Sequence, residues 1–335
     1  MSSVNKLLQF TKKGICCPQA DIFIDPSSPV ENAVITHGHS DHARTGCSNY
    51  LSHHLTVSIL KYRLGNNISA EGIEYNKAID INGVKLSLHP AGHIPGSAQV
   101  RLEYKGEVAV VSGDYKTEYD GLTEAFEPVK CNTFVTESTF ALPVYKWKKQ
   151  SDIFNDINNW WEKNKENGKA SVICGYSLGK AQRILHNVDR SIGKIYGHGA
   201  VTILNDLLIS EGIDLPEIEK ADLKIQKKDN AGALIIAPPS VVSNVWLRKF
   251  EPYSLGYASG WMNIRGAKRR QGIDIGFALS DHADWDELNK TVKETGAEKI
   301  YVTHGYTAVF VKWLREKGID AEEIITNYKL QITNN

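Results

Sequence analysis

The chain has 335 residues, enough to bury one large core or two modest ones, and its hydrophobic content of 41% is ordinary for a folded soluble protein. Lys and Arg number 39, and Asp and Glu also number 39, so no overall positive charge indicates nucleic acid, although local patches can still supply one. There is no signal-peptide-like segment and no apolar run of about 18 residues, so we expect a cytoplasmic location and no membrane partner.

Residues 1 to 140 contain short β-branched runs separated by Gly, Pro and Asn. The predicted strands are Asp21–Asp25, Ala33–Thr36, Val84–His89, Ala98–Tyr104, Val108–Ser112 and Thr133–Thr136, and the best helix is Leu55–Leu64. Repeated short strands with few helices predict stacked sheets that are covered by helices where these occur. The five cysteines are odd in number and lack a C-x-x-C pair, so we expect reduced packing residues.

Near residue 141 the pattern changes to alternating strands and helices, which is typical of a parallel sheet. The predicted elements are a helix ending over Trp160–Asn167, strand Ala170–Cys174, helix Leu178–Val188, and strands Lys194–Tyr196 and Ala233–Ala237. The chain then returns to strand Ile275–Leu279, helix Asp284–Thr295, strand Lys299–Thr303 and helix Ala308–Lys317. We therefore expect a core formed by residues 1–140 and 275–335, with a second domain inserted at 141–274.

Three histidines and an aspartate follow the strand that ends at Thr36, in the spacing H-x-H-x-D-H: His37, His39, Asp41 and His42. Nitrogen and carboxylate ligands without cysteine are typical of catalytic zinc sites and also suit manganese or iron. Because six consecutive residues do not wrap comfortably around one ion, we expect His37 and His39 to bind one metal and Asp41 and His42 a second. The alternative, surface histidines in a polar turn, requires four ligand residues to coincide by chance.

Later loops carry the residue types that would complete this site. His93 lies among Gly, Pro and Ser residues that let backbone approach a metal closely, and the nearby His89 is a weaker candidate. Asp114 follows an apolar strand and could bridge both ions, or form an Asx turn instead. His304 follows another strand and is expected to be the last ligand of the second metal, whereas Asp25 is expected to orient the histidine loop through hydrogen bonds.

Such a site favours an anionic substrate, because two divalent ions keep a net positive charge when their ligands are neutral histidines and two carboxylates. Two ions about 3.5–4 Å apart can clamp the attacking and leaving oxygens of a displacement at phosphorus, and metal binding lowers the pKa of water to about 7. Hydroxide is then available at neutral pH. The ligand set therefore predicts phosphodiester hydrolysis.

With these residues laid out, the chain resembles the metallo-β-lactamase fold, an αββα sandwich of the α+β class that holds a dinuclear site at one edge. Further motifs are similar to the successive signatures of the β-CASP nucleases, in which a cap domain is inserted into that core: Glu137-Ser138-Thr139-Phe140, Leu178-Gly179-Lys180-Ala181-Gln182, Ser259-Gly260-Trp261-Met262, Ser280-Asp281-His282-Ala283-Asp284 and Thr303-His304-Gly305. The resemblance spans nearly the whole chain, and is strongest to the bacterial ligase-associated DNA exonucleases.

The resemblance implies two zinc or manganese ions, the first on His37, His39, His93 and Asp114, and the second on Asp41, His42, Asp114 and His304. The attacking hydroxide would bridge these ions, which gives Asp41 and Asp114 a catalytic role as well. The resemblance also implies an acid pair, in which Glu137 holds His282 protonated so that the histidine can protonate the leaving oxygen. Alternatively, Glu137 caps a strand end and His282 caps the helix that begins near Asp284.

The predicted function is metal-dependent cleavage of nucleic acid, with single-stranded DNA in repair favoured and a DNA ligase or helicase partner implied by the family. His304 supports an RNA-processing alternative, because eukaryotic DNA-acting β-CASP proteins often carry valine there while RNA-processing members carry histidine. A lactonase or thioesterase is a second alternative, although a small substrate needs no domain-sized cover. A non-catalytic binding module is a third, although no ligand position has been lost.

Two basic clusters could line a nucleic-acid groove: Tyr145-Lys146-Trp147-Lys148-Lys149, and Arg265, Lys268, Arg269 and Arg270. Ser177 and Lys180 could hold a phosphate at a helix N-terminus, or Ser177 could simply cap that helix, and His198 is a further candidate phosphate contact. The same turn fits the G-x-S-x-G elbow of serine hydrolases, with Asp274 and either His282 or His304 completing a triad. That interpretation leaves the histidine motif and Asp114 unexplained.

Overall fold

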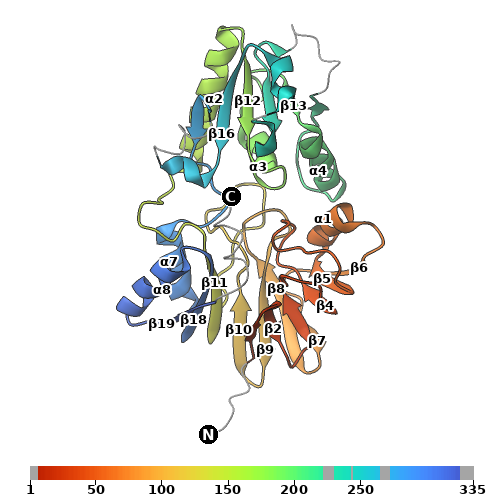
Figure 1. Cartoon of the computed structure of the whole chain (residues 1–335), viewed down its shortest axis with the longest axis vertical. Helices are drawn as coiled ribbons and strands as arrows, with labels where there is room; N and C mark the ends of the chain where they lie inside the picture. Colours follow the sequence, from red (N-terminus) through yellow and green to blue (C-terminus); the bar gives the residue numbers. More distant parts are fainter. Residues whose placement is uncertain (1–6, 222–229, 243, 265–271, 325–335) are drawn as a thin grey trace. The chain divides into compact units, whose positions relative to one another are not determined.

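The computed structural model describes residues 7–221, 230–242, 244–264 and 272–324 (Figure 1). The chain divides into two compact units. The first comprises residues 1–119, 123–146 and 282–335, and the second comprises residues 120–122 and 147–281. These limits lie a few residues beyond the domain boundaries expected at 141 and 274.

The first unit contains two sheets. One has the order β1 (Gln9–Thr11), β2 (Gly14–Cys17), β3 (Ile22–Ile24), β4 (Asn32–Val34), β5 (Asn49–His53), β6 (Ser69–Ile73). The other has the order β19 (Asp320–Glu323), β18 (Lys299–Gly305), β11 (Thr133–Ser138), β10 (Glu107–Val111), β9 (Ala98–Tyr104), β8 (Val84–Pro90), β7 (Ile79–Ile81). Since β8 and β10 both run antiparallel to β9, while β10, β11 and β18 are parallel, the carboxyl ends of β8, β10, β11 and β18 lie at one edge.

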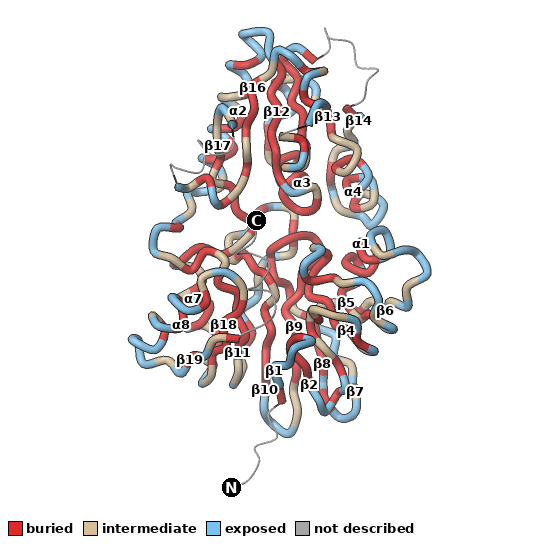
Figure 2. Tube along the Cα trace, in the orientation of Figure 1, coloured by how far each residue is buried: buried red, intermediate tan, exposed pale blue. Residues whose placement is uncertain are grey.

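Alternation along the strands explains how these sheets pack. In β10, Ala109 and Val111 join a core that also contains Ile22 and Ile24 of β3, whereas Val110 faces the other side. On that other side lie the apolar residues of helices α7 (Trp285–Thr295) and α8 (Thr307–Glu316), and helix α1 (His54–Leu64) packs through Leu60 against the first sheet. The buried strands stand out from the exposed outer turns in Figure 2.

The second unit is built on a six-stranded parallel sheet. Its order is β14 (Glu219–Lys220), β13 (Ile195–Gly197), β15 (Leu234–Ala237), β12 (Ala170–Cys174), β16 (Tyr253–Ala258), β17 (Ile275–Phe277). Its described helices are α2 (Gln150–Glu166), α3 (Lys180–Asn187) and α4 (Gly199–Ser210), with 3₁₀ turns η1 (Pro239–Val241), η2 (Val245–Phe250) and η3 (Gly260–Asn263). Both faces are covered, since Ile173 of β12 packs with α2 and α3 while Val172 packs with the η1 and η2 residues.

One predicted strand pairs differently from expectation. Residues Ile275–Leu279 were expected to resume the first core, but β17 pairs with β16 in the sheet of the second unit. Phe277 explains this difference, because its ring packs 5.5 Å from that of Trp160 on α2. An apolar run predicts a buried strand, and does not by itself identify the neighbouring strand.

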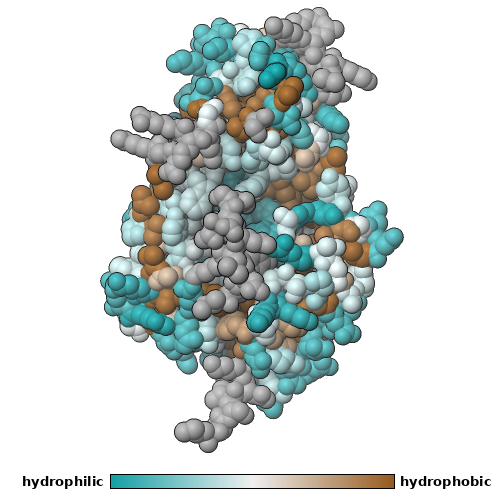
Figure 3. All heavy atoms as spheres, viewed as in Figure 1, coloured by the Kyte–Doolittle hydropathy of each residue, from teal (hydrophilic) through white to brown (hydrophobic). Residues whose placement is uncertain are grey.

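The mixed helix-and-strand class agrees with the prediction, and all five cysteines are unpaired. Hydrophilic and hydrophobic residues are interspersed on the face shown in Figure 3. Among the described residues, no helix combines the length and the apolar character that crossing a membrane would require.

Candidate metal centre

Four predicted ligands meet where strands of the first unit end. His37 and His39 lie on the loop after β4, His93 on the loop after β8, and Asp114 on the loop after β10. Each offers one ligand atom, and these four atoms lie within 4.8 Å of one another. The structure therefore brings together residues that are far apart in the sequence.

The spacing of these atoms suits a tetrahedral metal ion. His39 Nδ1 lies 3.1 Å from His37 Nε2 and 3.2 Å from His93 Nε2, and Asp114 Oδ2 lies 3.6 Å from His37 Nε2. Ligands about 2.0–2.1 Å from a tetrahedral zinc ion are about 3.3 Å from one another. The first cluster could thus hold a divalent cation.

A second cluster shares Asp114 with the first. His42, Asp114 and His304 also place ligand atoms within 4.8 Å of one another, and His42 Nε2 lies 3.4 Å from Asp114 Oδ2. The rings of His42 and His304 stack with centroids 5.0 Å apart. Asp41 stands at the rim: its side chain is 59% exposed and its Oδ2 is 3.9 Å from His42 Nε2. Asp41 is therefore near the second cluster without belonging to its close-packed group.

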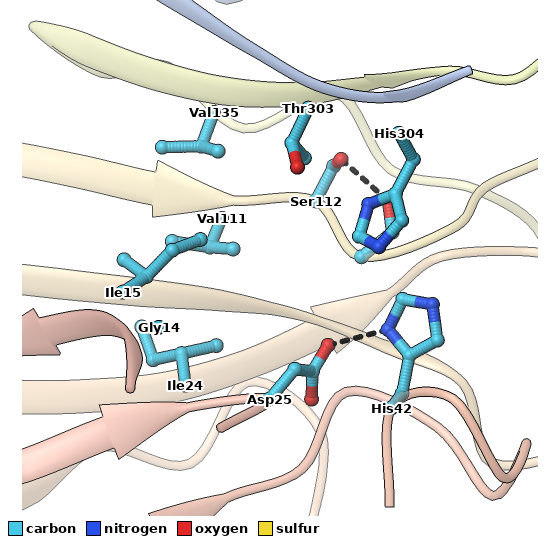
Figure 4. A pocket seen from close by; sticks show the side chains of 11 residues that line it. Gly14, Ile15, Ile24, Asp25, His42, Val111, Ser112, Val135, Thr303 and His304 are labelled. Carbon is cyan, nitrogen blue, oxygen red and sulfur yellow. Dashed lines mark hydrogen bonds and ion pairs between the residues drawn. The ribbon is translucent and has the colours of Figure 1, made fainter. Parts of the chain in front are cut away.

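Asp25 prepares His42 for ligation (Figure 4). Its carboxylate accepts hydrogen bonds from the Thr36 backbone N–H (2.8 Å), the Thr36 hydroxyl (2.6 Å) and His42 Nδ1 (2.7 Å). Because a carboxylate only accepts, His42 donates through Nδ1 and keeps a lone pair on Nε2 when neutral. That nitrogen is buried and lies 3.4 Å from Asp114 Oδ2, and it has no hydrogen bond of good geometry to any residue in the described ranges.

The electrostatics differ between the two clusters, because burial dominates at His37 while the carboxylates dominate at His42. Burial, together with neighbouring His42 and His93, holds the pKa of His37 well below its usual value, which keeps the ring in its neutral, ligating form. Burial would lower the pKa of His42, but Asp114 and Asp25 outweigh it and raise the pKa well above its usual value. Burial would raise the pKa of Asp114, yet His42 and His282 hold it well below its usual range. Asp114 is therefore a carboxylate that attracts positive charge.

A small, largely apolar cavity adjoins the second cluster. A cavity of about 30 Å³ is lined by His42, His304 and Asp25 together with apolar side chains such as Ile24 and Val111. Apolar surroundings keep the dielectric low, so charge interactions between these ligands and a cation are stronger than in water.

Glu137 and His282 form a close pair beside the first cluster. Glu137, at the end of β11, is buried and lies 2.9 Å from His282 Nδ1 through Oε2, while its Oε1 accepts the Tyr115 backbone N–H at 2.8 Å. The His282 ring lies 4.6 Å from that of His93 between centroids. Glu137, His282 and Asp114 also meet the distance criterion for a metal-ligand group, so this pair borders the centre directly.

Residues that the sequence analysis did not single out hold the ligand loops. Ser97 Oγ accepts the His93 backbone N–H at 3.1 Å, and Arg63 of α1 donates to the Gly38 carbonyl within the histidine loop. Gly113, with φ of 59°, passes so close to Thr36 that a Cβ there would lie 2.6 Å from the threonine hydroxyl. In the sequence, Thr36 and Gly113 could have been identified because each directly precedes a predicted ligand.

Replacing Asp25 with alanine is expected to weaken metal affinity by roughly 10- to 100-fold, because the group that fixes the tautomer and orientation of His42 is lost. Competition with a metal-binding dye would measure this affinity. Asp80→Ala, at an exposed hairpin of the same unit, provides the control. Unchanged affinity in the Asp25 variant would show that His42 needs no such partner.

One predicted phosphate contact is paired within the protein, and the predicted capping role of Ser177 is not found. Lys180 is buried and its ammonium lies 2.6 Å from Asp281 Oδ2, so it forms an internal ion pair. Helix α3 begins at Lys180 with Gly179 as its N-cap, so Ser177 is not the cap, and its carbonyl accepts from the Gln182 side chain. The motif alone could not reveal this ion pair, because Asp281 lies about 100 residues further along the chain.

The basic cluster near residue 147 is partly internal. Tyr145 is fully buried, with its ring 4.9 Å from that of Phe140, so it is not available for stacking on a base. Lys146 pairs with Asp286 at 2.8 Å, and Trp147 is half-buried. Arg265, Lys268, Arg269 and Arg270 lie outside the described residues.

His198 and Asp274 also have defined surroundings. His198 is the N-cap of α4 and accepts the Ala200 backbone N–H through Nδ1. Asp274 accepts from the Leu255 backbone N–H at 2.7 Å in the middle of β16, whereas Ser177 follows the end of β12. The carboxylate of Asp274, which the serine-hydrolase alternative would use, therefore forms a hydrogen bond within the sheet.

The weaker ligand candidate His89 contacts Ser87 instead of joining either cluster.

No family model matches the chain. Over 321 residues it is 27% identical to a protein named probable DNA ligase from Opitutus terrae, a match that covers 95% of this chain and 31% of that protein. It is 23% identical over 304 residues to the probable RNase MJ4 of Methanocaldococcus jannaschii, covering 74% of this chain and 69% of that protein. Endoribonuclease YSH1 of Saccharomyces cerevisiae is 26% identical over 121 residues, which are 36% of this chain and 15% of that protein.

The chain thus spans about a third of the length of the Opitutus relative and a smaller share of YSH1. A crystal structure described as a protein of unknown function from Enterococcus faecalis V583 superposes with a TM-score of 0.60 at 13% identity, over 88% of this chain and 79% of that one. This last likeness concerns the fold alone.

Proposed function

Because the chain belongs to the β-CASP type of the metallo-β-lactamase fold, we propose that it is a metal-dependent nuclease that hydrolyses phosphodiester bonds, with single-stranded DNA as substrate. The packing of the first unit, two sheets around one core with helices outside, supports the four-layer αββα sandwich of that fold. The second unit would be the inserted cap.

The shared position of Asp114 is the observation that carries the proposal. Its Oδ2 lies within 3.6 Å of ligand nitrogens in both clusters, as a carboxylate between two cations would require. His37, His39, His93 and Asp114 would hold the first zinc or manganese ion, and Asp114, His42 and His304, with Asp41 at the rim, the second. When bound, such ions supply Lewis acidity at phosphorus and lower the pKa of water.

Glu137 and His282 would handle the departing oxygen. The buried Glu137 carboxylate accepts a hydrogen bond from His282 Nδ1–H, which orients the ring and stabilises its protonated form. His282 Nε2 would then donate its proton to the leaving oxygen of the strand. The Tyr115 N–H fixes the other oxygen of Glu137, so the pair is held before any substrate arrives.

DNA is favoured because the Opitutus relative, matched over nearly the whole chain, is named for a DNA enzyme. The proposal extends to a role in DNA repair in the cytoplasm with a DNA ligase or helicase as partner, and of these the name of that relative concerns the ligase alone. RNA cleavage is the second candidate, supported by His304 in the second cluster and by two relatives named as ribonucleases.

The test is incubation of metal-stripped protein with 5′-labelled single-stranded DNA and with RNA of matched sequence, restoring zinc or manganese separately. We expect no cleavage without metal and preferential cleavage of DNA once metal is restored. Cleavage of RNA alone would replace the DNA assignment. Turnover of a lactone or thioester panel without any nuclease activity would overturn the proposed function.

A further inference from the structure

Four charged side chains are buried together in the second unit. Lys180 and Arg183 lie on α3, Asp120 lies between β10 and β11 in the sequence, and Asp281 follows β17. Each residue is at most 4% exposed. Because buried ion pairs add little net stability compared with apolar side chains of the same size, the geometry of this group is its informative feature.

The chain segment that ends at Asp281 is held at three points. Lys180 Nζ lies 2.6 Å from Asp281 Oδ2, and Arg183 Nη1 lies 3.2 Å from Asp281 Oδ1. The same nitrogen of Arg183 donates to the Ser280 carbonyl. Both carboxylate oxygens and the preceding carbonyl are thus engaged, which fixes the side chain and the backbone of Asp281 together.

Arg183 also contacts the other segments through which the chain enters the second unit. Its Nε donates to Gln150 Oε1 at 2.6 Å and lies 3.9 Å from Asp120 Oδ2. The Gln150 side chain in turn donates to the Asp120 carbonyl at 3.1 Å. Since this unit comprises residues 120–122 and 147–281, one guanidinium contacts residues at or near each of its junctions with the first unit.

The residue that follows Asp281 in the chain is His282. Because the peptide bond is planar, only two rotatable backbone bonds separate the Cα atoms of these two residues. On the other side of His282, the Ala283 N–H donates to the Tyr115 carbonyl at 2.7 Å, and the Tyr115 N–H donates to Glu137. The His282 backbone is therefore anchored on both sides, and one anchor also holds its partner Glu137.

We propose that Lys180 and Arg183 are positioning residues that align His282 by fixing Asp281. The inference rests on the proposed function, in which His282 gives a proton to the leaving oxygen. Proton transfer requires the ring to lie within hydrogen-bond reach of that oxygen, and a misplacement of about 1 Å can lower a rate by about 10²-fold. The two cations act through the backbone of the segment that ends at Asp281.

The first test is the single-turnover cleavage of 5′-labelled single-stranded DNA by full-length Arg183→Lys with metal restored. Lysine keeps the positive charge, so no carboxylate is left buried without a counter-ion. One ammonium cannot replace a guanidinium that binds Gln150 through Nε and Ser280 through Nη1. We expect the rate to fall roughly 10- to 100-fold with the metal content unchanged. Arg190→Lys is the matched control, because Arg190 is exposed in the same unit.

A second variant removes the ion pair of Lys180 and keeps the buried charges balanced. In the Lys180→Met, Asp281→Leu protein, Arg183 and Asp120 remain as one cation and one carboxylate, and leucine has the branched shape of aspartate. Apolar replacements of whole buried ion pairs are often tolerated, and thermal unfolding would confirm that both variants are folded. We expect a loss of cleavage of the same order as in Arg183→Lys.

Two comparisons distinguish positioning of His282 from a general structural role. A nucleotide ester of p-nitrophenol needs no proton on its leaving oxygen, so Arg183→Lys should cleave this ester at close to the normal rate. In a protein that already carries His282→Ala, Arg183→Lys should cause no further loss, because the effects of coupled residues do not add.

Three results would overturn the inference and leave the proposed function standing. They are an unchanged rate on DNA in both variants, equal losses on DNA and on the p-nitrophenol ester, and an undiminished further loss in the His282→Ala background. If the unsubstituted protein cleaves no nucleic acid with either metal, the proposed function and this inference both fall.

Discussion

Nuclease activity is expected to fall by roughly 10³-fold or more when Asp114 is replaced by asparagine, at or beyond the upper end of what loss of one electrostatic group costs. The physical reason is that Asp114 alone belongs to both metal-ligand clusters, so a neutral amide weakens attraction for both cations at once. Cleavage rates under single-turnover conditions and the metal content per chain would be measured together. We expect the metal content to fall along with the rate.

Asp80→Asn is the matched control for this substitution. Asp80 is exposed in β7 and accepts the Gly83 N–H through Oδ1, an oxygen that asparagine retains. This variant should bind metal and cleave substrate normally. Full activity in a folded Asp114→Asn protein would contradict the two-cation interpretation of the site.

Removal of the His282 imidazole is expected to lower the cleavage rate by roughly 10²- to 10⁴-fold, the usual contribution of a positioned proton donor. Metal content should remain that of the unsubstituted protein, because the two clusters that include His37 and His304 lack His282. The measurement is the single-turnover rate of His282→Ala on a natural phosphodiester. Glu137→Gln is expected to act in the same direction, since it removes the charge that stabilises the protonated ring.

Substrates with different leaving groups can distinguish proton donation by His282 from a structural role of this residue. A nucleotide ester of p-nitrophenol departs as a stable anion and needs no proton, so His282→Ala should cleave this ester much closer to the normal rate than it cleaves the natural strand. Equal losses on both substrates would show that His282 supports the site structurally. Loss of bound metal in the variant would likewise contradict the assignment.

Much of the fold follows from local patterns. Strand β9 matches its predicted bounds, since its apolar residues alternate, and α1 begins one residue before the predicted start. Helix α4 was missed because its polar residues do not mark a solvent face: Thr202 and Asn205 are buried, whereas Ile203 is exposed. The pairing of β17 was missed because it depends on the packing of Phe277 against Trp160, and a contact between residues so far apart in the sequence has no local pattern.

Some residues of the candidate site can likewise be predicted from the sequence, and others cannot. His37, His39, His93 and Asp114 could be grouped from the sequence, because each follows a strand and metal chemistry restricts the residue types. The surroundings of Lys180 could not, because only the folded chain shows its pairing with Asp281.

The parallel pairing of β11 with β18 also determines when the second cluster can form. His304 reaches the site on β18, after the whole of the second unit has intervened in the sequence. At synthesis rates of about 5–20 residues per second, roughly 10–40 s pass between emergence of Asp114 and of His304. A growing chain therefore holds the ligands of the first cluster well before those of the second. The second cluster cannot be complete before residue 304 has been synthesised.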